Sequence, residues 1–400
     1  MDTASRNYLT LTAAYWAFTV TDGAIRMLVV LHFHHLGYSP FEVAMLFLFY
    51  EFFGVVTNLA GGWVGARLGL DRTLLGGMAL QVVALALLTV PDAWLTVPWV
   101  MFAQALSGIA KDLNKMSAKA SVKHLTGAEE QGRLFRWVAL LTGSKNALKG
   151  AGFFIGAALL QSVGFRGALW TLAGMLTGVL WITARRLPRG TGRMKAKPRF
   201  HHLLSRVAAV NRLSAARFFL FGSRDLWFVV GLPVYLYDVL GWRFTQVGAF
   251  MALWVIGYGL VQAATPGLLR RRHRGRGPGG RDARRLASAL AVVPAAIALA
   301  LAHGGPPAWV VTLGLAGYGL VFALNSAVHS YLVLAYASRD GVALDVGFYY
   351  MANAGGRLTG TLLSGWAYQS WGLVGCLWLS AAFVTAAALL SLGLPDPDRN

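Results

Sequence analysis

Long stretches without a charged side chain recur along this sequence and limit the chain to very few folds. Residues 73–90, 286–302 and 376–394 contain no acidic or basic residue, and each is close to the roughly 20 residues that a helix needs to cross a bilayer. Because lipid offers no hydrogen-bond partners, the backbone of such segments must bond within itself, as it does in a helix. The chain is 56% hydrophobic and 13% charged, against about 25% charged residues in soluble domains. The sequence therefore predicts an all-α membrane protein.

The apolar stretches form two groups of six spans. We expect an N-terminal half at 1–183, a basic cytoplasmic linker at 184–211 and a C-terminal half at 212–400. Hydrophobicity places the spans at 8–36, 41–66, 73–91, 96–124, 133–163, 166–183, 212–240, 243–266, 284–303, 307–336, 342–369 and 373–394.

The two groups are related in sequence. The segment Gln161–Trp170 recurs as Gln369–Trp378, with six identities in ten positions at a shift of 208 residues. The same shift makes Lys149 equivalent to Arg357. We therefore expect these two cations to contact one substrate from both halves.

A weaker similarity supports the same division. It relates 36–43 to 240–247 and brings Asp22 close to Asp225. Parallel halves related by an axis along the membrane normal are typical of major facilitator transporters. We expect that fold, with about twelve transmembrane helices in two pseudo-symmetric halves; the alternative is chance similarity among apolar segments.

The positive charge of the chain is concentrated between spans. The formal net charge is +20, and the densest basic clusters lie at 185–212 and 270–285. With the amino terminus inside, both clusters are cytoplasmic, as the positive-inside rule requires. This distribution favours contact with anionic membrane lipids over nucleic acid. We expect a multi-pass protein of a bacterial cytoplasmic (inner) membrane with both termini cytoplasmic and, since Cys376 is the lone cysteine, no internal disulfide.

Charged residues near the middle of the spans are the candidate functional residues, because a charge within a bilayer is costly unless it is paired or faces water. Spans three, six, nine and twelve, which lie outermost in a major facilitator fold, have none. The cations outnumber the carboxylates, which favours a small anionic substrate. The candidate substrate-binding residues are Arg26, Lys111, Lys115, Lys145, Lys149, Arg224, Arg357, Asn114, Asn146 and Asn353. The candidate coupling or gating residues are Asp22, Glu51, Asp112, Asp225 and Arg67.

Lysines form a stripe on span four. Lys111, Lys115, Lys119 and Lys123 recur every four residues and therefore stack on one helical face. The alternative for the last two is that they extend to the lipid headgroups.

Two pairs of neighbouring charges have more than one explanation. Asp22 and Arg26 are four residues apart, so a salt bridge within span one explains them as well as a coupling role does. Arg224 and Asp225 are adjacent and do not face each other on a helix, so we expect them to need other partners.

The segment between spans two and three partly fits the Gly-x-x-x-Asp-Arg-x-Gly gating loop of major facilitator proteins. Gly62, Arg67 and Gly69 match the pattern, but Ala66 stands where the pattern has Asp. This replacement puts the gate contact of that aspartate in question.

Neither metal nor cofactor chemistry is indicated. His32, His34 and His35 are too close in sequence to converge on one ion from a helix. The sequence has no Walker motif and no catalytic constellation. We expect a transporter without a cofactor rather than an enzyme, and a membrane receptor or membrane enzyme is the remaining alternative class.

Four segments carry a resemblance to a known family. Tyr15–His34, Met45–Gly54, Ala105–Lys119 and Leu141–Gly150 resemble the ArsJ-type organoarsenical efflux permeases of the major facilitator superfamily. The similarity extends over nearly the whole chain and is weaker in span nine and at 270–285.

The resemblance implies export of 1-arseno-3-phosphoglycerate, the unstable ester that forms when a glyceraldehyde-3-phosphate dehydrogenase uses arsenate in place of phosphate. The ester decomposes to arsenate outside the cell, so that dehydrogenase is the implied functional partner and arsenate resistance the implied outcome. The residues alone indicate an anion, and only the resemblance supplies arsenic. A carrier for a sugar phosphate or an organic acid is the alternative. The sequence does not indicate the energy coupling, and a monomer is normal for this architecture.

Overall fold

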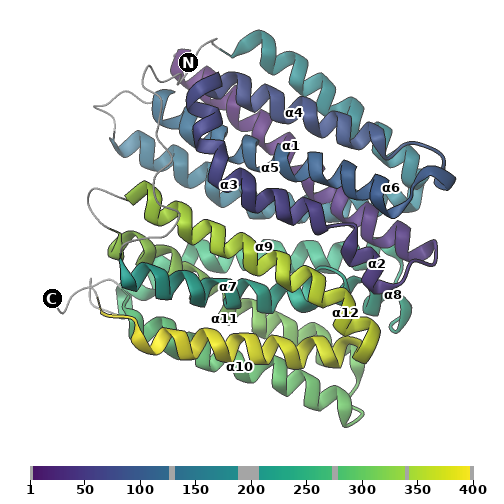
Figure 1. The fold of residues 1–400 in the computed structure, drawn as a ribbon, viewed down its shortest axis with the longest axis vertical. Helices are drawn as coiled ribbons and strands as arrows, with labels where there is room; N and C mark the ends of the chain where they lie inside the picture. Colours follow the sequence, from purple (N-terminus) through teal and green to yellow (C-terminus); the bar gives the residue numbers. More distant parts are fainter. Residues whose placement is uncertain (1–2, 126–130, 188–206, 273–277, 338–341, 397–400) are drawn as a thin grey trace. The chain divides into compact units, whose positions relative to one another are not determined.

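The computed structural model describes residues 3–125, 131–187, 207–272, 278–337 and 342–396, and these residues contain helices but no strand. The predicted linker at 184–211 falls largely outside them. In chain order the elements are α1 (Thr3–His35), α2 (Pro40–Met45), α3 (Leu48–Leu68), α4 (Leu70–Leu87), η1 (Asp92–Trp94), α5 (Val97–Leu125), α6 (Gln131–Arg186), α7 (Ala208–Phe228), α8 (Gly231–Asp238), α9 (Phe244–Arg272), α10 (Gly280–Ala302), α11 (Pro307–Tyr336), α12 (Val342–Leu390) and η2 (Ser391–Gly393) (Figure 1).

Eight helical segments in the described part of the chain are long and apolar enough to cross a membrane. Two of them, in α6 and α12, are double-length and each is interrupted once, at Gly164 (φ 73°) and Gly372 (φ 62°). Positive φ suits glycine, which lacks a Cβ, so each long helix forms two consecutive spans. The two glycines are 208 residues apart, the shift of the sequence repeat.

Span seven is a pair of helices rather than one. α7 ends at Phe228 and α8 begins at Gly231. Pro233 explains the break, because a proline within a helix has no N–H to donate and its ring clashes with the carbonyl four residues before it, here that of Val229. The hydroxyl of Ser364 on α12 accepts a hydrogen bond from the N–H of Gly231 (3.1 Å).

The helices group into two units. Unit 1 comprises Met1–His32, Phe49–Phe200 and Phe244–Val255; unit 2 comprises Phe33–Leu48, His201–Arg243 and Ile256–Asn400. Each unit thus takes most of one predicted half together with a short segment from the sequence of the other half.

Equivalent glutamines bind the two exchanged segments. In unit 1 the side-chain oxygen of Gln161 accepts a hydrogen bond from the backbone N–H of Thr245 (3.2 Å). In unit 2 the side-chain oxygen of Gln369 accepts one from the N–H of Phe41 (3.2 Å). Both amides lie in the first turn of a helix, where N–H groups have no partner within the helix. The repeat in sequence is therefore also a repeat of contacts.

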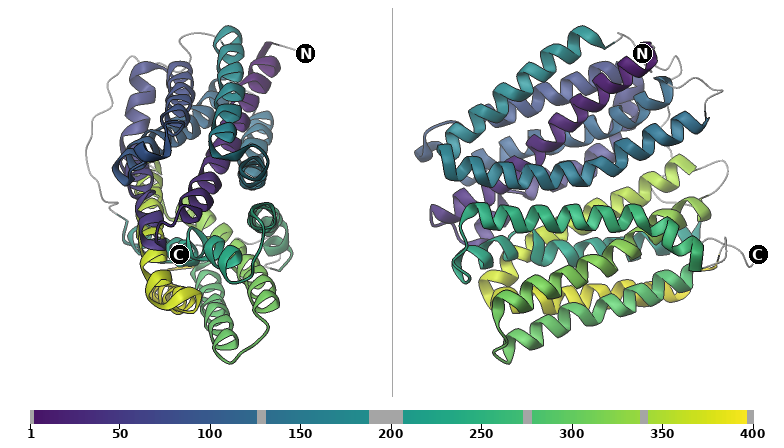
Figure 2. Two further views of the ribbon diagram at one scale, coloured as in Figure 1. Left: turned by 90° about the vertical axis from the view of Figure 1, so that its right-hand side faces the viewer. Right: turned by 180° about the vertical axis from the view of Figure 1, so that it is seen from behind.

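Each unit has its own apolar core. In unit 1, α1, α4, α5 and the second part of α6 bury Leu11, Phe18, Met78, Ala110 and Leu176 together. In unit 2, where α10 lies beside α11 and α12 (Figure 2), the core contains Leu213, Ala283, Val328, Leu332 and Tyr349.

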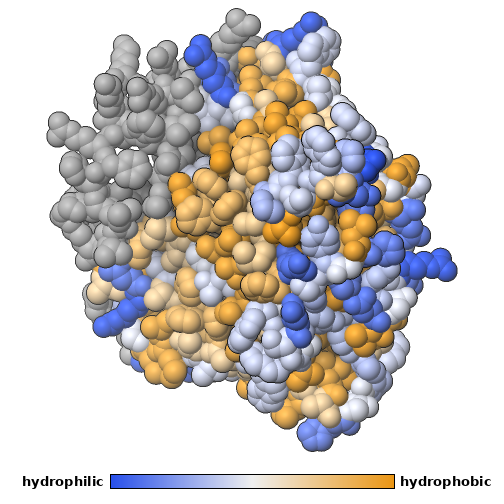
Figure 3. Space-filling model, turned by 45° about the vertical axis from the view of Figure 1, so that its right-hand side comes forward, coloured by the Kyte–Doolittle hydropathy of each residue, from blue (hydrophilic) through white to orange (hydrophobic). Residues whose placement is uncertain are grey.

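Large apolar side chains also cover the outside of the molecule. Trp170 and Trp181 on the second part of α6 are 60% and 57% exposed, and Val292 on α10 and Leu313 on α11 are 65% and 64% exposed. Broad hydrophobic areas cover much of the face shown in Figure 3. Water-soluble proteins rarely expose apolar surface of this extent, so this surface is suited to lipid.

Candidate functional site

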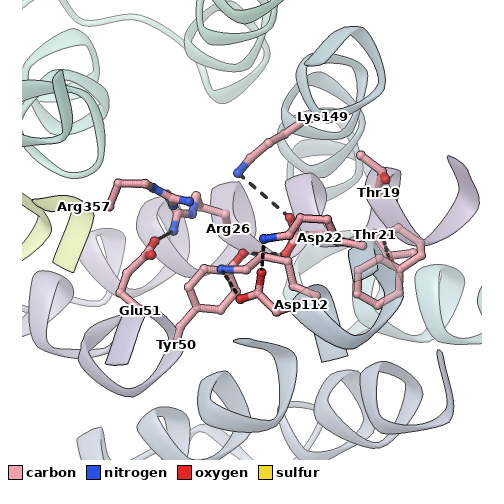
Figure 4. Close-up of polar contacts among 12 residues, drawn as sticks. Thr19, Thr21, Asp22, Arg26, Tyr50, Glu51, Asp112, Lys149 and Arg357 are labelled. Atoms are coloured by element: carbon pink, nitrogen blue, oxygen red, sulfur yellow. Dashed lines mark hydrogen bonds and ion pairs between the residues drawn. The ribbon is translucent and has the colours of Figure 1, made fainter. Parts of the chain in front are cut away.

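Unit 1 contains a network of buried charges. Arg26 on α1 forms a salt bridge with Glu51 on α3, and both side chains are almost completely buried. Asp22, one turn before Arg26, accepts a hydrogen bond from the hydroxyl of Tyr50 (2.6 Å) and lies 3.9 Å from the ammonium of Lys149 on α6 (Figure 4). Asp22 and Arg26 therefore find partners on other helices instead of forming the salt bridge within span one that their spacing permits.

A second part of the same network lies on α5. Asp112 is 1% exposed and pairs with Lys115 (2.6 Å) and Lys111 (3.7 Å). Lys115 also donates to the side-chain oxygen of Asn58 on α3 (2.9 Å). Lys145 on α6 lies within electrostatic range of the Asp112 carboxylate. The first two lysines of the stripe thus belong to the network, whereas the side chains of Lys119 and Lys123 lie outside the described residues.

Unit 2 has a related but simpler arrangement. Asp225 on α7 is completely buried and contacts Arg357 on α12 (3.2 Å). The guanidinium of the adjacent Arg224 also donates to Asp225, with 2.7 Å from its Nε. The expectation that adjacent residues need other partners was therefore wrong for Arg224, because its long side chain turns back to its neighbour. It was right for Asp225, which also binds Arg357.

The two networks have equivalent ion pairs. Lys149 with Asp22 in unit 1 corresponds to Arg357 with Asp225 in unit 2, since Lys149 and Arg357 are 208 residues apart. Glycines one turn later allow the helices that carry these pairs to approach closely. A Cβ on Gly152 would lie 2.4 Å from the carbonyl oxygen of Val20, and one on Gly360 would lie 2.5 Å from that of Gly222. Such contacts between small residues are usual between membrane helices.

Cations exceed carboxylates in both networks. Among the described residues, the network of unit 1 brings together five cations, Arg26, Lys111, Lys115, Lys145 and Lys149, and three carboxylates, Asp22, Glu51 and Asp112. In unit 2, Asp225 serves both Arg224 and Arg357. The carboxylates thus help to hold the cations in place.

The remaining candidates lie in different places. Asn353 on α12 accepts a hydrogen bond from Arg217, and Asn146 follows Lys145 on α6, partly buried. Asn114 instead donates to Ala110 of its own helix (2.9 Å) and packs against Gly77 on α4, away from the lysines. The side chain of Arg67 lies outside the described residues.

Arg217 is a buried cation that the sequence analysis missed. It lies 5% exposed on α7. Span seven was expected to begin at residue 212, which placed Arg217 near a membrane surface, but α7 begins at Ala208. The available signal was its spacing, because Arg217 precedes Arg224 by two helical turns.

The three outer histidines have separate environments. His32 stacks on Phe165, His34 contacts Asp238 (2.7 Å) and His35 contacts the hydroxyl of Tyr237 (3.1 Å). Within the described residues, no three His, Cys, Asp or Glu side chains form a group that could hold a metal ion.

Solved structures share this fold. A mutant of the nucleoside transporter NupG matches with a TM-score of 0.73 and 14% identity, over 96% of this chain and 98% of that chain. A POT family transporter in complex with 5-aminolevulinic acid matches with a TM-score of 0.76 and 16% identity, over 97% and 95%. A POT family transporter in complex with a thioalcohol-conjugated peptide matches with a TM-score of 0.75 and 15% identity, over 97% and 95%. Identities this low show the fold alone, and no curated protein sequence matches the chain.

The sequence itself identifies the family. The profile of the Major Facilitator Superfamily matches residues 11–339, which is most of the chain. The proteins of this superfamily carry small substrates across membranes and are not enzymes. The chain therefore belongs to the Major Facilitator Superfamily and is a multi-pass membrane protein that acts as a secondary transporter.

Proposed function

We propose that this transporter exports a small anion with more than one negative charge from the cytoplasm, namely the organoarsenical 1-arseno-3-phosphoglycerate. The observation that supports the anion is that the buried and partly buried cations of the two charge networks outnumber the carboxylates with which they pair. The arsenic rests on the resemblance of the sequence to ArsJ-type permeases. Export would confer arsenate resistance together with a glyceraldehyde-3-phosphate dehydrogenase, from a bacterial inner membrane with both termini in the cytoplasm.

Lys149 and Arg357 are the cations that we assign to substrate recognition first. Lys149 lies 3.9 Å from Asp22, and it is equivalent to Arg357 in the repeat of 208 residues. Arg357 shares Asp225 with Arg224. Lysine binds a phosphate group as a point charge and arginine binds it through two parallel N–H groups, so the chemistry of each side chain suits an anionic ligand.

Arsenate tolerance of a sensitive bacterium tests this function. Expression of the transporter together with the dehydrogenase should raise tolerance, and either protein alone should not. Lys149→Gln and Arg357→Gln should each return tolerance toward that of cells without the transporter. Arg166→Gln is the matched control, because Arg166 is 48% exposed and pairs with the exposed Asp92. Normal tolerance with both Lys149→Gln and Arg357→Gln, at equal protein levels, contradicts the assignment.

The same cations also fit a carrier for another phosphorylated or carboxylated anion. Transport of labelled sugar phosphates and organic acids into inside-out vesicles distinguishes the two functions. Saturable uptake of such an anion, without any arsenate tolerance in the cellular assay, identifies this second function.

A further inference from the structure

Arg217 differs from the other buried arginines in having no carboxylate partner among the described residues. Arg26 pairs with Glu51, and Arg224 and Arg357 both pair with Asp225. Arg217 is about as deeply buried as Arg26, yet within the described part of the chain all its hydrogen bonds go to neutral groups. A buried cation without a counter-ion is costly.

The neutral contacts hold the guanidinium without using all its donors. Its Nε donates to Asn353 (2.9 Å), and its Nη1 donates to both the backbone oxygen and the hydroxyl of Ser326 (3.2 Å each). Its plane is supported by the ring of Phe221, 3.8 Å from the guanidinium carbon. Arginine has five N–H donors, and the two on Nη2 make no hydrogen bond to the described residues. The side chain is thus oriented but not satisfied.

A histidine without a hydrogen-bond partner in the described structure lies near Arg217, and an unpartnered asparagine lies one turn before it on the same helix. His329 on α11 is completely buried, is within electrostatic range of Arg217, and has no hydrogen-bond partner there for either ring nitrogen. Asn325, one turn before His329, is also completely buried, and neither its amide nitrogen nor its oxygen bonds to a described residue. Buried polar atoms normally find a partner in the protein or in ordered water. A buried histidine within electrostatic range of an arginine that has no carboxylate partner in the described structure adds a hydrogen-bonding group that suits an anion.

A ring of polar groups surrounds Ser326. Tyr258 and Gln262 on α9 contact its hydroxyl at 3.2 and 3.3 Å. Groups of α11 and α12 therefore bind the guanidinium that α7 carries, and two side chains of α9 contact the Ser326 hydroxyl that accepts its hydrogen bond. Oxygen atoms of a phosphate or carboxylate accept several hydrogen bonds at once, and the planar guanidinium binds them through two parallel N–H groups.

We propose that Arg217, with Ser326 and His329, forms a subsite in unit 2 for one phosphate or carboxylate group of the transported substrate. The inference rests on the proposed function, because it assigns one anionic end of the substrate to this place. Phe221 contacts the guanidinium groups of both Arg217 and Arg224, at 3.8 and 5.3 Å. α7 thus presents one arginine that Asp225 compensates and one that a ligand compensates.

Binding of 3-phosphoglycerate and of inorganic phosphate to the purified full-length protein tests the subsite. The measurement is isothermal titration in nanodiscs of neutral lipid. Arg217→Gln should weaken binding of 3-phosphoglycerate on the order of tenfold or more. Arg217→Lys keeps the charge but loses the planar pair of donors, so its affinity should lie between those of the native protein and of Arg217→Gln. Arg166→Gln should bind like the native protein.

Thermal unfolding separates a binding role from a structural one. If Arg217 only ties α7 to α11 and α12, Arg217→Gln lowers the unfolding temperature and leaves the affinity of the folded protein within about twofold of native, and the proposal is wrong. If it binds the anion, the ligand-free variant unfolds near the native temperature and loses most of the stabilisation by 3-phosphoglycerate.

Two further comparisons distinguish a soluble anion from a lipid headgroup as the ligand, and the proposed subsite from the proposed arsenical function. If an effect of Arg217→Gln appears only when phosphatidylglycerol is present and never with the soluble anions, the guanidinium serves a lipid headgroup and the proposal is overturned. Affinity that depends on Arg217, in a protein that gives no arsenate tolerance, supports the subsite and contradicts only the arsenical function. Tolerance that is unaffected by Arg217→Gln, with unchanged affinity, contradicts only the subsite.

Discussion

Some buried carboxylates in this protein each pair with two cationic side chains. Asp225 is the clearest case, because it is completely buried and serves two arginines. Removing one arginine leaves the other to neutralise Asp225, whereas removing the carboxylate takes an ion-pair partner from two partly buried cations. Asp225 therefore contributes more to the stability of the folded protein than either Arg224 or Arg357.

Asp225→Asn should therefore destabilise the protein by about 3–5 kcal/mol, the usual cost of breaking a buried ion pair from one side. Arg357→Gln should cost clearly less. Thermal unfolding in detergent gives both values. Asp92→Asn is the control, since its pair with Arg166 is exposed and should contribute no more than about 1 kcal/mol. Equal destabilisation by Asp225→Asn and Asp92→Asn would show that Asp225 is not the centre of its network.

Helices in this protein are joined at their ends as well as along their faces. Gln161 and Gln369 are equivalent in the repeat, and each binds the first turn of a helix from the other half of the sequence. The segments 244–255 and 33–48 are thereby tied to units to which most of their own half does not belong.

Gln161→Ala and Gln369→Ala should each reduce stability by about 1 kcal/mol, because each leaves one helix-terminal N–H without its partner. Thermal unfolding should show losses of similar size, and the double variant should show their sum, since the two contacts share no residue. The variants Gln161→Glu and Gln369→Glu keep an acceptor oxygen and serve as controls. A loss in only one of the two alanine variants would mean that the contacts are not equivalent.

At the scale of the whole molecule, transport against a gradient needs a coupling site. Asp22, Glu51, Asp112 and Asp225 are all buried, and burial and nearby cations act on a carboxyl group in opposite directions. A carrier that binds protons at one of them needs that carboxyl for uphill movement but not for exchange of substrate between the two sides.

If export is coupled to protons, then Asp22→Asn, Glu51→Gln, Asp112→Asn or Asp225→Asn should abolish concentrative transport and leave counterflow exchange. Both rates are measured with the same reconstituted protein, so exchange controls for folding. Survival of uphill transport in all four single variants excludes an individual requirement for any of them.

The sequence by itself determined the membrane class, the all-helical fold and the internal repeat, because these depend on local hydrophobicity, span length and a similarity at a shift of 208 residues. It also predicted most of the buried charges, since uncharged flanking residues mark their depth.

Only the tertiary structure decided how those charges pair. Asp22 binds Lys149 and Tyr50 from other helices, not Arg26 of its own, and Asn114 faces α4 rather than the lysines. Arg217 could not be assigned until the start of α7 was known. Partner choice depends on which helix faces come together, and that is set by packing between segments far apart in the sequence, which no local pattern records.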